Sequence, residues 1–330
     1  MRRSACILPI LAVASLLACG EPPAGHLDVS RDAMGTYVRI QIVGAGDAVS
    51  RDAAEAAYAE IERLEAMLSE WRADSEISAI NDAAGVAPVP VGPETLAVVR
   101  LAVDLSARTA GAFDPTFASC GRLWSFRDRV VPSGDDLEAC LDRVDGSAIE
   151  IDDREATVFL PRAGMRIGIA GIGKGWILDR AADVLRARGV RDFSVDGGGD
   201  LVVSGRGPRG RWVLGIADPR DPGTLHGSIE APDGAVVTSG DYMQAFEKDG
   251  RRYHHILDPR TGMPAGRSSA ITVVAPDAAT ADALATGLFV LGPAAALEWV
   301  EATPGVEALV FDPEGSARAS SGFPAVRTVP

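Results

Sequence analysis

Asp282 and Thr286 place a carboxylate and a hydroxyl four residues apart. The sequence predicts a helix from about 278 to 291, closed by Gly292 and Pro293, so the two side chains share one helical face. Such hard oxygen ligands suit Mg²⁺ and do not suit zinc. Oxygens of water and phosphate would complete the coordination shell of the Mg²⁺ ion. The same spacing also fits a solvated aspartate beside a threonine in the core, so the pair alone leaves the metal site open.

A glycine-rich stretch at 171–175, Gly-Ile-Gly-Lys-Gly, begins a second predicted helix, which ends at Gly189. Glycines let backbone N–H groups approach a phosphate, the N-terminus of a helix is electropositive, and Lys174 adds a positive charge. The stretch is not a Walker A loop, because the GxxxxGKS or GxxxxGKT spacing is absent. It is a candidate phosphate cradle, and a tight turn with a surface lysine is the alternative.

Two histidines, His254 and His255, stand just before the sequence Asp-Pro-Arg-Thr-Gly at 258–262. An imidazole beside such a turn can take a proton from a hydroxyl at neutral pH, and Asp258 can orient it. A surface or capping histidine is the alternative for either residue.

Aromatic residues make up only 5% of the chain, which draws attention to Trp71, Phe113 and Tyr242. A flat aromatic face suits a flavin ring, although each of these side chains, taken alone, also suits the core. The stretch Asp-Gly-Gly-Gly-Asp at 196–200 follows a predicted strand. Its backbone either approaches a ligand or forms a hairpin or bulge.

The elements that must position these residues mix the helical and the strand period. Apolar residues recur at helical spacing over 53–69, and another helix is predicted from Pro93 to Gly111. Strands are predicted at 34–43, 192–195, 201–204, 212–217, 235–238, 271–274 and 307–311. Because the order lacks a strict βαβ rhythm, we expect one α+β domain with two lobes over 29–330, whose mixed or antiparallel sheets are flanked by helices.

The first residues indicate an export signal. Arg2 and Arg3 precede an apolar run too short to span a bilayer, and Leu-Leu-Ala-Cys at 16–19 resembles a bacterial lipobox. We expect a signal peptide at 1–18, acylation of Cys19, including palmitate, and a tether over 19–28. This predicts a lipoprotein on the periplasmic side of the cell envelope, with the inner membrane favoured over the outer. The alternative is an ordinary secretory signal with a chance cysteine.

The 330-residue chain carries a formal net charge of −14. Nucleic-acid binding requires basic surface, so this charge argues against a nucleic-acid partner. It also opposes an anionic ligand unless a metal ion bridges the two. Once Cys6 and Cys19 are assigned to the signal and the anchor, Cys120 and Cys140 remain, and they form either a disulfide or two buried thiols.

In their order, these motifs resemble those of the ApbE-type FAD:protein FMN transferases, a family that includes flavin-trafficking lipoproteins and NosX-like factors. The resemblance covers about 34–292. It rests on Met-Gly-Thr at 34–36, Ser-Glu-Ile-Ser-Ala-Ile-Asn at 75–81, Gly-Ala-Phe-Asp-Pro-Thr at 111–116, Thr-Ser-Gly-Asp-Tyr at 238–242, His-Ile-Leu-Asp-Pro-Arg-Thr-Gly at 255–262, and the pair Asp282 and Thr286. Each motif alone is modest, and their shared order is specific.

The resemblance implies an enzyme that transfers FMN from FAD to a threonine hydroxyl of a target flavoprotein and releases AMP. It implies Mg²⁺ on the pyrophosphate, held by Asp282, Thr286 and the backbone carbonyl of Gly171, with His255 as the base and Asp258 and Lys174 in the catalytic set. The implied FAD contacts are Met34, Trp71, Ala112, Phe113, Asp114, Lys174 and Ile256. The implied acceptors carry a Ser/Thr-Gly-Ala-Thr-like sequence and belong to Na⁺-pumping (Nqr) or Rnf-type membrane complexes or to NosR-like regulators.

Two other functions stay open. One is an FAD pyrophosphatase, in which water replaces the threonine, and the other is a non-catalytic periplasmic FAD-binding or maturation lipoprotein. The chain also departs twice from the family pattern. Gly168 stands six positions before Lys174, where the family usually has an acidic residue, and Asp196 stands where it has asparagine. The first departure concerns nucleotide binding, and the second adds negative charge near a possible ligand wall.

Overall fold

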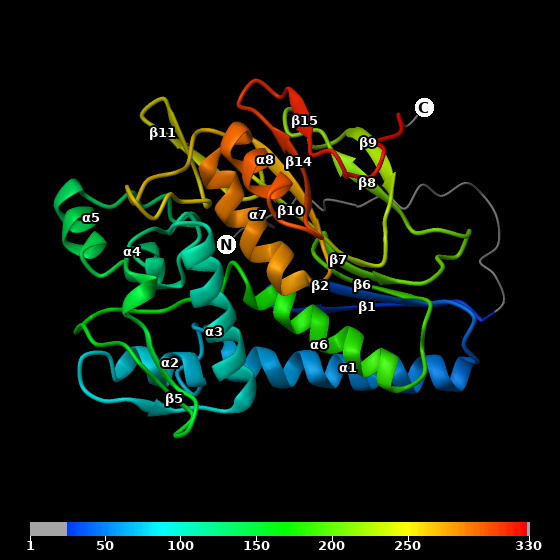
Figure 1. Cartoon of the computed structure of the whole chain (residues 1–330), viewed down its shortest axis with the longest axis horizontal. Helices are drawn as coiled ribbons and strands as arrows, with labels where there is room; N and C mark the ends of the chain where they lie inside the picture. Colours follow the sequence, from blue (N-terminus) through cyan, green and yellow to red (C-terminus); the bar gives the residue numbers. More distant parts are fainter. Residues whose placement is uncertain (1–24, 329–330) are drawn as a thin grey trace, which may run out of the picture.

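A large antiparallel sheet runs through the computed structural model (Figure 1), which describes residues 25–328. The predicted signal peptide at 1–18 and Cys19 lie outside the described residues. The sheet has eight strands in the order β1-β2-β6-β7-β10-β13-β14-β15, and every neighbouring pair is antiparallel. The strands are β1 (Leu27–Ala33), β2 (Thr36–Ile42), β6 (Phe193–Gly197), β7 (Asp200–Ser204), β10 (Gly234–Gly240), β13 (Ala270–Ala275), β14 (Glu307–Phe311) and β15 (Ala317–Ala319).

A two-residue turn joins β1 to β2. Ala33 pairs with Thr36, and the intervening Met34 and Gly35 have φ of 53° and 71°. A two-residue turn with both central residues in the left-handed conformation matches the twist of the two strands of a hairpin. The backbone N–H of Met34 is held by Oε2 of Glu65 at 3.0 Å, so this turn is fixed to the helix that follows.

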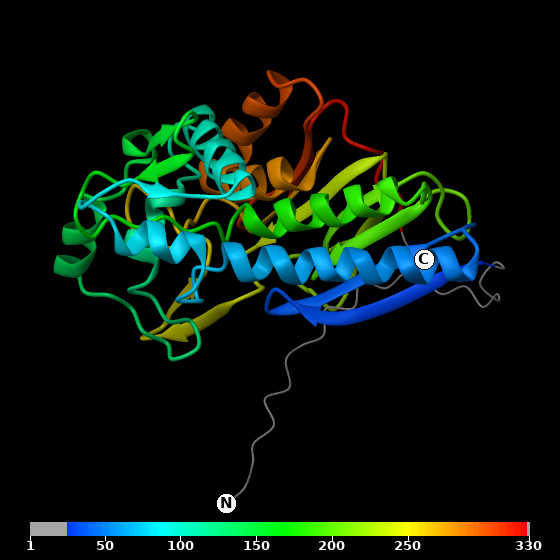
Figure 2. The same ribbon diagram turned by 90° about the horizontal axis from the view of Figure 1, so that it is seen from below.

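Helices cover one face of the sheet. They are α1 (Asp47–Leu68), α6 (Gly173–Ala187), α7 (Ala278–Leu291) and α8 (Pro293–Glu301). Figure 2 shows α1 and α6 side by side along the β1 edge, while α7 packs on β10 and β13 and α8 on β14. Alternate residues of β2, namely Val38, Ile40 and Ile42, are fully buried against this layer. Each such side chain contributes about 1.5–3 kcal/mol relative to an exposed one.

The opposite face of the sheet is covered by the hairpin of β8 (Val213–Ala217) and β9 (Leu225–Glu230). The buried side chains between the hairpin and the sheet form a second apolar cluster that includes Leu201, Val203, Trp212, Leu214, Ile229 and Val236. The central strands are therefore buried on both faces, which explains their nearly continuous apolar sequences.

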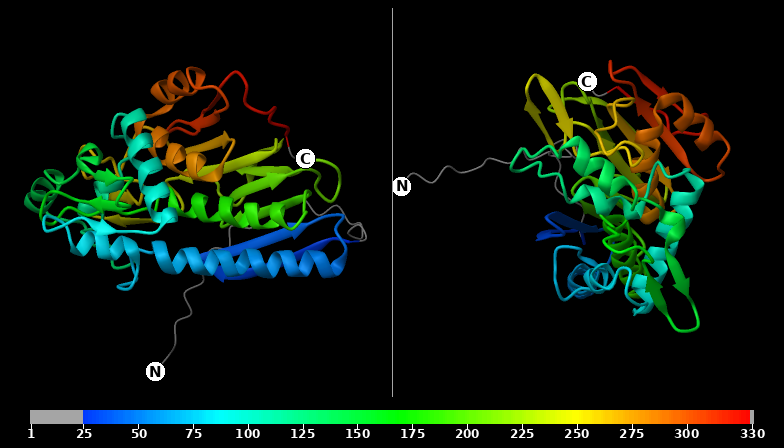
Figure 3. Two further views of the ribbon diagram at one scale, coloured as in Figure 1. Left: turned by 60° about the horizontal axis from the view of Figure 1, so that its bottom comes forward. Right: turned by 90° about the vertical axis from the view of Figure 1, so that its left-hand side faces the viewer.

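A second lobe lies at one end of the sheet (Figure 3). It contains α2 (Glu76–Asp82), α3 (Pro93–Arg108), η1 (Pro115–Phe117), α4 (Ala118–Gly121), α5 (Gly134–Leu141), η2 (Gly146–Ala148), and a small sheet of β3 (Val89–Pro90), β5 (Thr157–Phe159) and β4 (Glu150–Asp152). A disulfide joins Cys120 to Cys140, with the two Cα atoms 5.2 Å apart. It decides the question that the cysteine pattern left open.

The predicted α+β class with antiparallel sheets is confirmed. The predicted helix at 278–291 coincides with α7, and the predicted strand at 307–311 coincides with β14. The sequence missed α8, because Pro293 serves as its first residue although Gly292 and Pro293 also end α7. It also missed the exposed hairpin of β11 (Ala245–Lys248) and β12 (Arg251–His254). No helix within residues 25–328 is long and apolar enough to cross a membrane.

Candidate functional site

The first turns of α6 and α7 meet in the interior. A β-carbon on Gly175 would lie 2.1 Å from the carbonyl oxygen of Ala278, so only glycine allows the two backbones to touch here. The carboxylate of Asp179 accepts hydrogen bonds from the N–H groups of Ala278 and Ala279 at 2.8 and 2.9 Å. These contacts place two electropositive helix starts side by side.

The three metal-ligand candidates come together at this point. A β-carbon on Gly171 would lie 3.2 Å from Oγ1 of Thr286, and Oδ2 of Asp282 accepts a hydrogen bond from the N–H of Gly175 at 3.1 Å. Burial, followed by the nearby carboxylate of Asp200, raises the pKa of Asp282 to about 7. A buried carboxylate of this kind is stabilised by a cation.

A metal at this position would depend on more than acidic side chains. Within residues 25–328, no group of three or more histidine, cysteine, aspartate or glutamate side chains could hold a metal ion. The candidate donors are instead the carboxylate of Asp282 and the hydroxyl of Thr286, and the family resemblance adds the backbone carbonyl of Gly171. Such an oxygen-only set matches a hard cation that keeps several ligand or water oxygens.

Lys174 lies among buried carboxylates. Its Nζ atom is 2.5 Å from Oδ2 of Asp200, whose side chain is only 4% exposed. Burial opposes the charge of Lys174, but the carboxylates of Asp200, Asp282 and Asp196 outweigh burial and raise the pKa of Lys174. Lys174 therefore stays protonated, and the cluster as a whole retains negative charge that a cation would neutralise.

Asp196, one of the two departures from the family pattern, is buried within this cluster. Its Oδ1 accepts a hydrogen bond from the N–H of Gly199 at 2.8 Å, and its Oδ2 accepts one from the hydroxyl of Tyr37 at 3.3 Å. Burial raises the pKa of Asp196. The side chain thus holds the 196–200 turn together, which is the structural alternative that the sequence offered for this stretch.

His255 follows β12 directly and is within electrostatic reach of Lys174. Burial, together with the positive charges of His254 and Lys174, lowers the pKa of His255 to about 4. Its Nδ1 atom is buried without a hydrogen-bond partner, and the ring packs edge-on to Phe126 with centroids 6.5 Å apart. The imidazole is therefore neutral at physiological pH and can accept a proton.

The neighbouring His254 has a structural environment. Its Nε2 is 2.7 Å from the carbonyl oxygen of Ala265, and its ring packs edge-on to Phe289. Nδ1 is without a partner in both histidines, and His255 is the one whose pKa the charge of Lys174 lowers.

Asp258 is engaged by its own turn. Its carboxylate accepts hydrogen bonds from Nε and Nη2 of Arg260 at 2.8 and 2.6 Å, and its backbone carbonyl accepts one from the N–H of Gly262 at 2.9 Å. Because Nδ1 of His255 has no partner, Asp258 does not hold that nitrogen. The indole of Trp124 donates to the carbonyl of Gly262 at 3.1 Å, which links the turn to the disulfide-bonded lobe.

The predicted FAD contacts divide into exposed and buried side chains. Trp71 is 86% exposed, whereas Ala112, Phe113 and Ile256 are buried. The carboxylate of Asp114 accepts four hydrogen bonds, from the N–H and hydroxyl of Thr116, the hydroxyl of Ser106 and the N–H of Gly146. The side chain of Asp114 thus stabilises the loop beside the site, and both of its carboxylate oxygens have hydrogen-bond partners.

Two hollows border these elements. A cavity of about 230 Å³ is lined by Gly111, Asp114, Leu141, Val144, Pro259 and Arg260, so the 111–116 and 255–262 motifs lie side by side. A larger hollow of about 510 Å³ lies on α3 between Pro93 and Asp104 and contains none of the predicted site residues. The smaller cavity is the one next to the chemistry.

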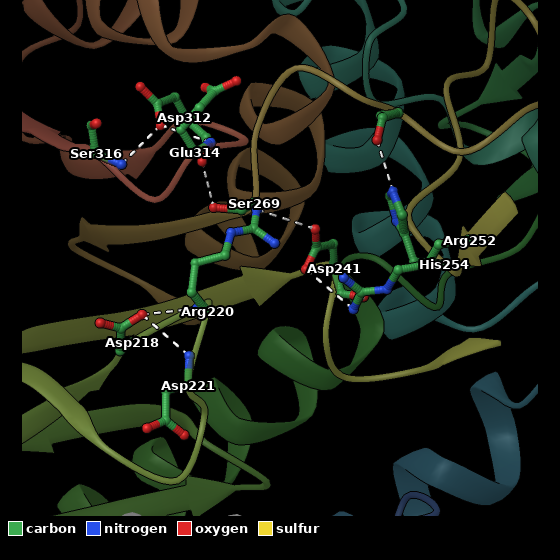
Figure 4. A network of polar contacts seen from close by, with 11 residues as sticks. Asp218, Arg220, Asp221, Asp241, Arg252, His254, Ser269, Asp312, Glu314 and Ser316 are labelled. Atoms are coloured by element: carbon green, nitrogen blue, oxygen red, sulfur yellow. Dashed lines mark hydrogen bonds and ion pairs between the residues drawn. The ribbon is translucent and has the colours of Figure 1, made fainter. Parts of the chain in front are cut away.

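Two carboxylates, Asp241 and Glu70, have contacts that the sequence did not predict. Figure 4 shows Asp241, at the end of the 238–242 motif, between the guanidinium groups of Arg220 and Arg252 at 3.8 and 3.5 Å. Arg252 also donates to the backbone carbonyl of Asp241 at 2.9 Å. A second such residue is Glu70, whose carboxylate fills the space beside Gly168. Glu70 and Gly168 are far apart in the chain, so only the fold brings them together.

Comparison with known proteins gives concordant matches. The family model described as the ApbE family matches residues 34–310. The FAD:protein FMN transferase of Treponema pallidum is 33% identical and covers 97% of this chain and 96% of its own length. That of Vibrio cholerae is 35% identical, with coverages of 86% and 87%.

Solved structures agree with these sequence matches. The ApbE protein of Thermotoga maritima superposes with a TM-score of 0.83 at 34% identity, covering 90% of this chain and 98% of that one. The flavin transferase ApbE of Vibrio cholerae superposes with a TM-score of 0.82 at 32% identity, covering 91% and 99%.

Proposed function

We propose, from the premise that this chain belongs to the ApbE family and is a flavin transferase, that it transfers FMN from FAD to a threonine hydroxyl of a partner flavoprotein and releases AMP. The family and the enzyme class that the motifs indicated are confirmed. Mg²⁺, the threonine acceptor and AMP release belong to the proposal. The observation that carries it is the meeting of Gly171, Lys174, Asp282 and Thr286 where α6 and α7 begin.

The donor set fits Mg²⁺. Asp282 and Thr286 offer a carboxylate and a hydroxyl from one helix face, and a β-carbon on Gly171 would lie 3.2 Å from the hydroxyl oxygen of Thr286. The raised pKa of Asp282 marks a carboxylate that lacks a full positive partner. A bound Mg²⁺ would neutralise charge on the diphosphate of FAD, which also reconciles an anionic substrate with a chain of net charge −14.

The residues of the chain have separate tasks in the transfer. Lys174 places a fixed positive charge beside the diphosphate. Neutral His255 accepts the proton of the threonine hydroxyl as its oxygen bonds to the FMN phosphorus. The bond from that phosphorus to the bridging oxygen breaks, and AMP leaves with the bridging oxygen. Positioning and charge stabilisation supply most of the catalysis in such transfers.

The cellular setting is part of the same proposal. Acyl chains on Cys19 would hold the enzyme on the periplasmic side of a membrane, where it would meet acceptors of the Nqr, Rnf or NosR type. The Cys120–Cys140 disulfide supports this location, because stable disulfides are typical of exported proteins.

The test uses the protein from residue 20 onward, FAD, Mg²⁺ and a folded acceptor domain with a Ser/Thr-Gly-Ala-Thr-like sequence. The intact mass of the acceptor is measured before and after incubation, and AMP is measured in the supernatant. A gain of one FMN with an equal amount of AMP is expected, and EDTA should abolish both.

Matched threonine variants give the control. Thr286→Ala should lose the transfer, whereas Thr280→Ala, on the same helix but outside the site, should retain it. Free FMN and AMP with an unmodified acceptor would instead indicate a pyrophosphatase. FAD that stays intact while bound would indicate a binding protein, and either result would overturn the transferase proposal for this acceptor class.

A further inference from the structure

Glu70 carries a half-buried carboxylate that has no partner in the part of the chain that the structure describes. It follows the C-terminal end of α1, in the connection to α2. Among residues 25–328, no hydrogen bond or ion pair is formed by its carboxylate. Burial raises the pKa of Glu70, and the more distant charge of Arg166 only partly offsets this. A carboxylate withdrawn from water without a donor is costly, and a hydrogen-bond donor on a bound ligand would offset this cost.

The carboxylate occupies the space beside Gly168. A β-carbon on Gly168 would lie 2.8 Å from Oε2 and 3.2 Å from Oε1 of Glu70, and 2.9 Å from the β-carbon of Ala118. The backbone of Gly168 is fixed by its N–H, which donates to the carbonyl of Pro115 at 2.9 Å. Gly168 is three residues before Gly171, so Glu70 reaches the loop that leads into the proposed phosphate site.

The surroundings favour a nucleoside rather than a phosphate. A carboxylate repels phosphate oxygens but accepts hydrogen bonds from hydroxyl and amine groups. The next residue, Trp71, is 86% exposed and offers an aromatic face to a base. The Glu70 carboxylate is a hydrogen-bond acceptor beside the exposed indole of Trp71, and both lie one loop away from the proposed phosphate site. This arrangement matches a purine nucleoside attached to a diphosphate.

The location of Glu70 also indicates which half of a bound FAD it would contact. In Figure 1 the α1–α2 connection lies below the start of α6, and the β11 hairpin, after which His255 follows, lies above it. The proton acceptor belongs on the side where the acceptor oxygen meets the FMN phosphorus. In an in-line displacement the leaving group departs on the other side, which is the side of Glu70 and Trp71.

We propose that Glu70, whose carboxylate lies beside Gly168, accepts a hydrogen bond from the adenosine half of FAD, through a ribose hydroxyl or the base amine. This inference rests on the proposed function, because it assumes FAD as the substrate. It makes Glu70 a determinant of the affinity for the leaving AMP and assigns it no part in the affinity for FMN.

The first experiment is isothermal titration calorimetry of the Mg²⁺-loaded protein with FAD, AMP and FMN separately. Glu70→Gln keeps the shape of the side chain and removes its charge. It should weaken FAD and AMP binding by about tenfold to a hundredfold, the loss expected for a hydrogen bond to a charged group, with FMN unchanged. Glu62→Gln, an exposed glutamate on α1, is the matched control and should bind all three as the natural protein does.

The second experiment moves the carboxylate. Gly168→Asp alone should weaken FAD binding, because its side chain would meet the carboxylate of Glu70. The triple variant Glu70→Ala, Gly168→Asp and Ala118→Gly should bind AMP more tightly than Glu70→Ala with Ala118→Gly. The change Ala118→Gly removes the β-carbon that would lie 2.9 Å from the new side chain, and a carboxylate then returns to the same space. A purely structural role for Glu70 would not produce this rescue.

The outcomes are distinct. Unchanged AMP affinity in Glu70→Gln, equal losses for AMP and FMN, or a loss for FMN alone would each overturn the assignment to adenosine. Failure of the natural protein to bind FAD at all would instead overturn the proposed function.

Discussion

Replacing Lys174 by methionine tests whether the charge cluster beneath the site is held together by this one cation. Lys174 forms its ion pair with Asp200 at 2.5 Å, and the Asp200 side chain is 4% exposed. The Lys174 side chain is 31% exposed, so its removal, which leaves the buried charge of Asp200 uncompensated, costs about 3 kcal/mol, the lower end for a buried pair. We therefore expect Lys174→Met to lower the free energy of unfolding by about that amount at pH 8, where the carboxylates are ionised.

The loss should depend on pH in a defined direction. In the natural protein burial raises the pKa values of Asp200 and Asp282 although the charge of Lys174 lowers them, so the loss of Lys174 should raise both further above their values in the unfolded chain. Ionisation of such acids lowers the free energy of unfolding. This loss of stability is complete above the pKa of the acid in the folded protein, and it disappears as the pH falls below that pKa. Since the pKa of Asp282 is about 7, the gap between variant and natural protein should narrow from pH 8 to pH 5.

The measurement is urea and thermal unfolding at both pH values. The double variant Lys174→Met with Asp200→Asn removes both charges and should regain most of the stability, while transfer activity stays lost because the cation beside the diphosphate is missing. Lys248→Met, at the chain's other lysine, which is exposed, is the control and should unfold as the natural protein does. A Lys174→Met protein with natural stability at pH 8, or a double variant no more stable than the single one, would refute this account.

Three further predictions concern neighbouring features. Replacing Cys120 and Cys140 by serine should lower stability by about 3 kcal/mol, from a closed loop with a sequence separation of 20. Calorimetry with and without reductant checks this, and a reductant-insensitive melting temperature would contradict it. Mg²⁺ affinity should fall about tenfold per pH unit below the Asp282 pKa of about 7 and level off above it, because a proton competes for the carboxylate. Titration calorimetry at several pH values measures this, and a flat profile counts against Asp282 as a ligand. Asp179→Ala leaves two buried N–H groups without a hydrogen-bond acceptor, at a cost of about 1–3 kcal/mol each. Urea unfolding should therefore show a lower free energy of unfolding for Asp179→Ala, and no such loss for Asp183→Ala, at an exposed position on the same helix.

Much of the fold was predictable where an apolar pattern is long. The helix at 278–291 and the strand at 307–311 were predicted with their observed bounds, because burial imposes the period of the element on the sequence. The short exposed strands β11 and β12 leave a weak pattern and were missed. The disulfide could not be decided from cysteine spacing, because whether two cysteines pair depends on the distance between them in the fold.

The site was predictable in part, and for a different reason. Asp282 and Thr286 share a helix face, so their proximity follows from spacing alone. The proximity of Gly171 to Thr286 comes from the packing of two helices and was expected only from the family resemblance. Nothing in the sequence around Glu70 points to Gly168, about a hundred residues away, because their contact depends on how the α1–α2 connection meets the loop before α6. Asp258 shows the opposite case, since its spacing suggested an orienting partner for His255 while the local turn binds it to Arg260.

The contact between α6 and α7 has a consequence for the synthesis of the protein. Gly175 and Asp179 are translated about a hundred residues before Ala278, the residue that fills the space at Gly175 and donates to the Asp179 carboxylate. A nascent chain that ends before α7 has neither Asp282 nor Thr286, and its α6 packs on α1 but lacks its contact with α7. Incomplete chains are therefore expected to be inert toward the diphosphate, so that an interrupted round of translation does not release a fragment that consumes FAD.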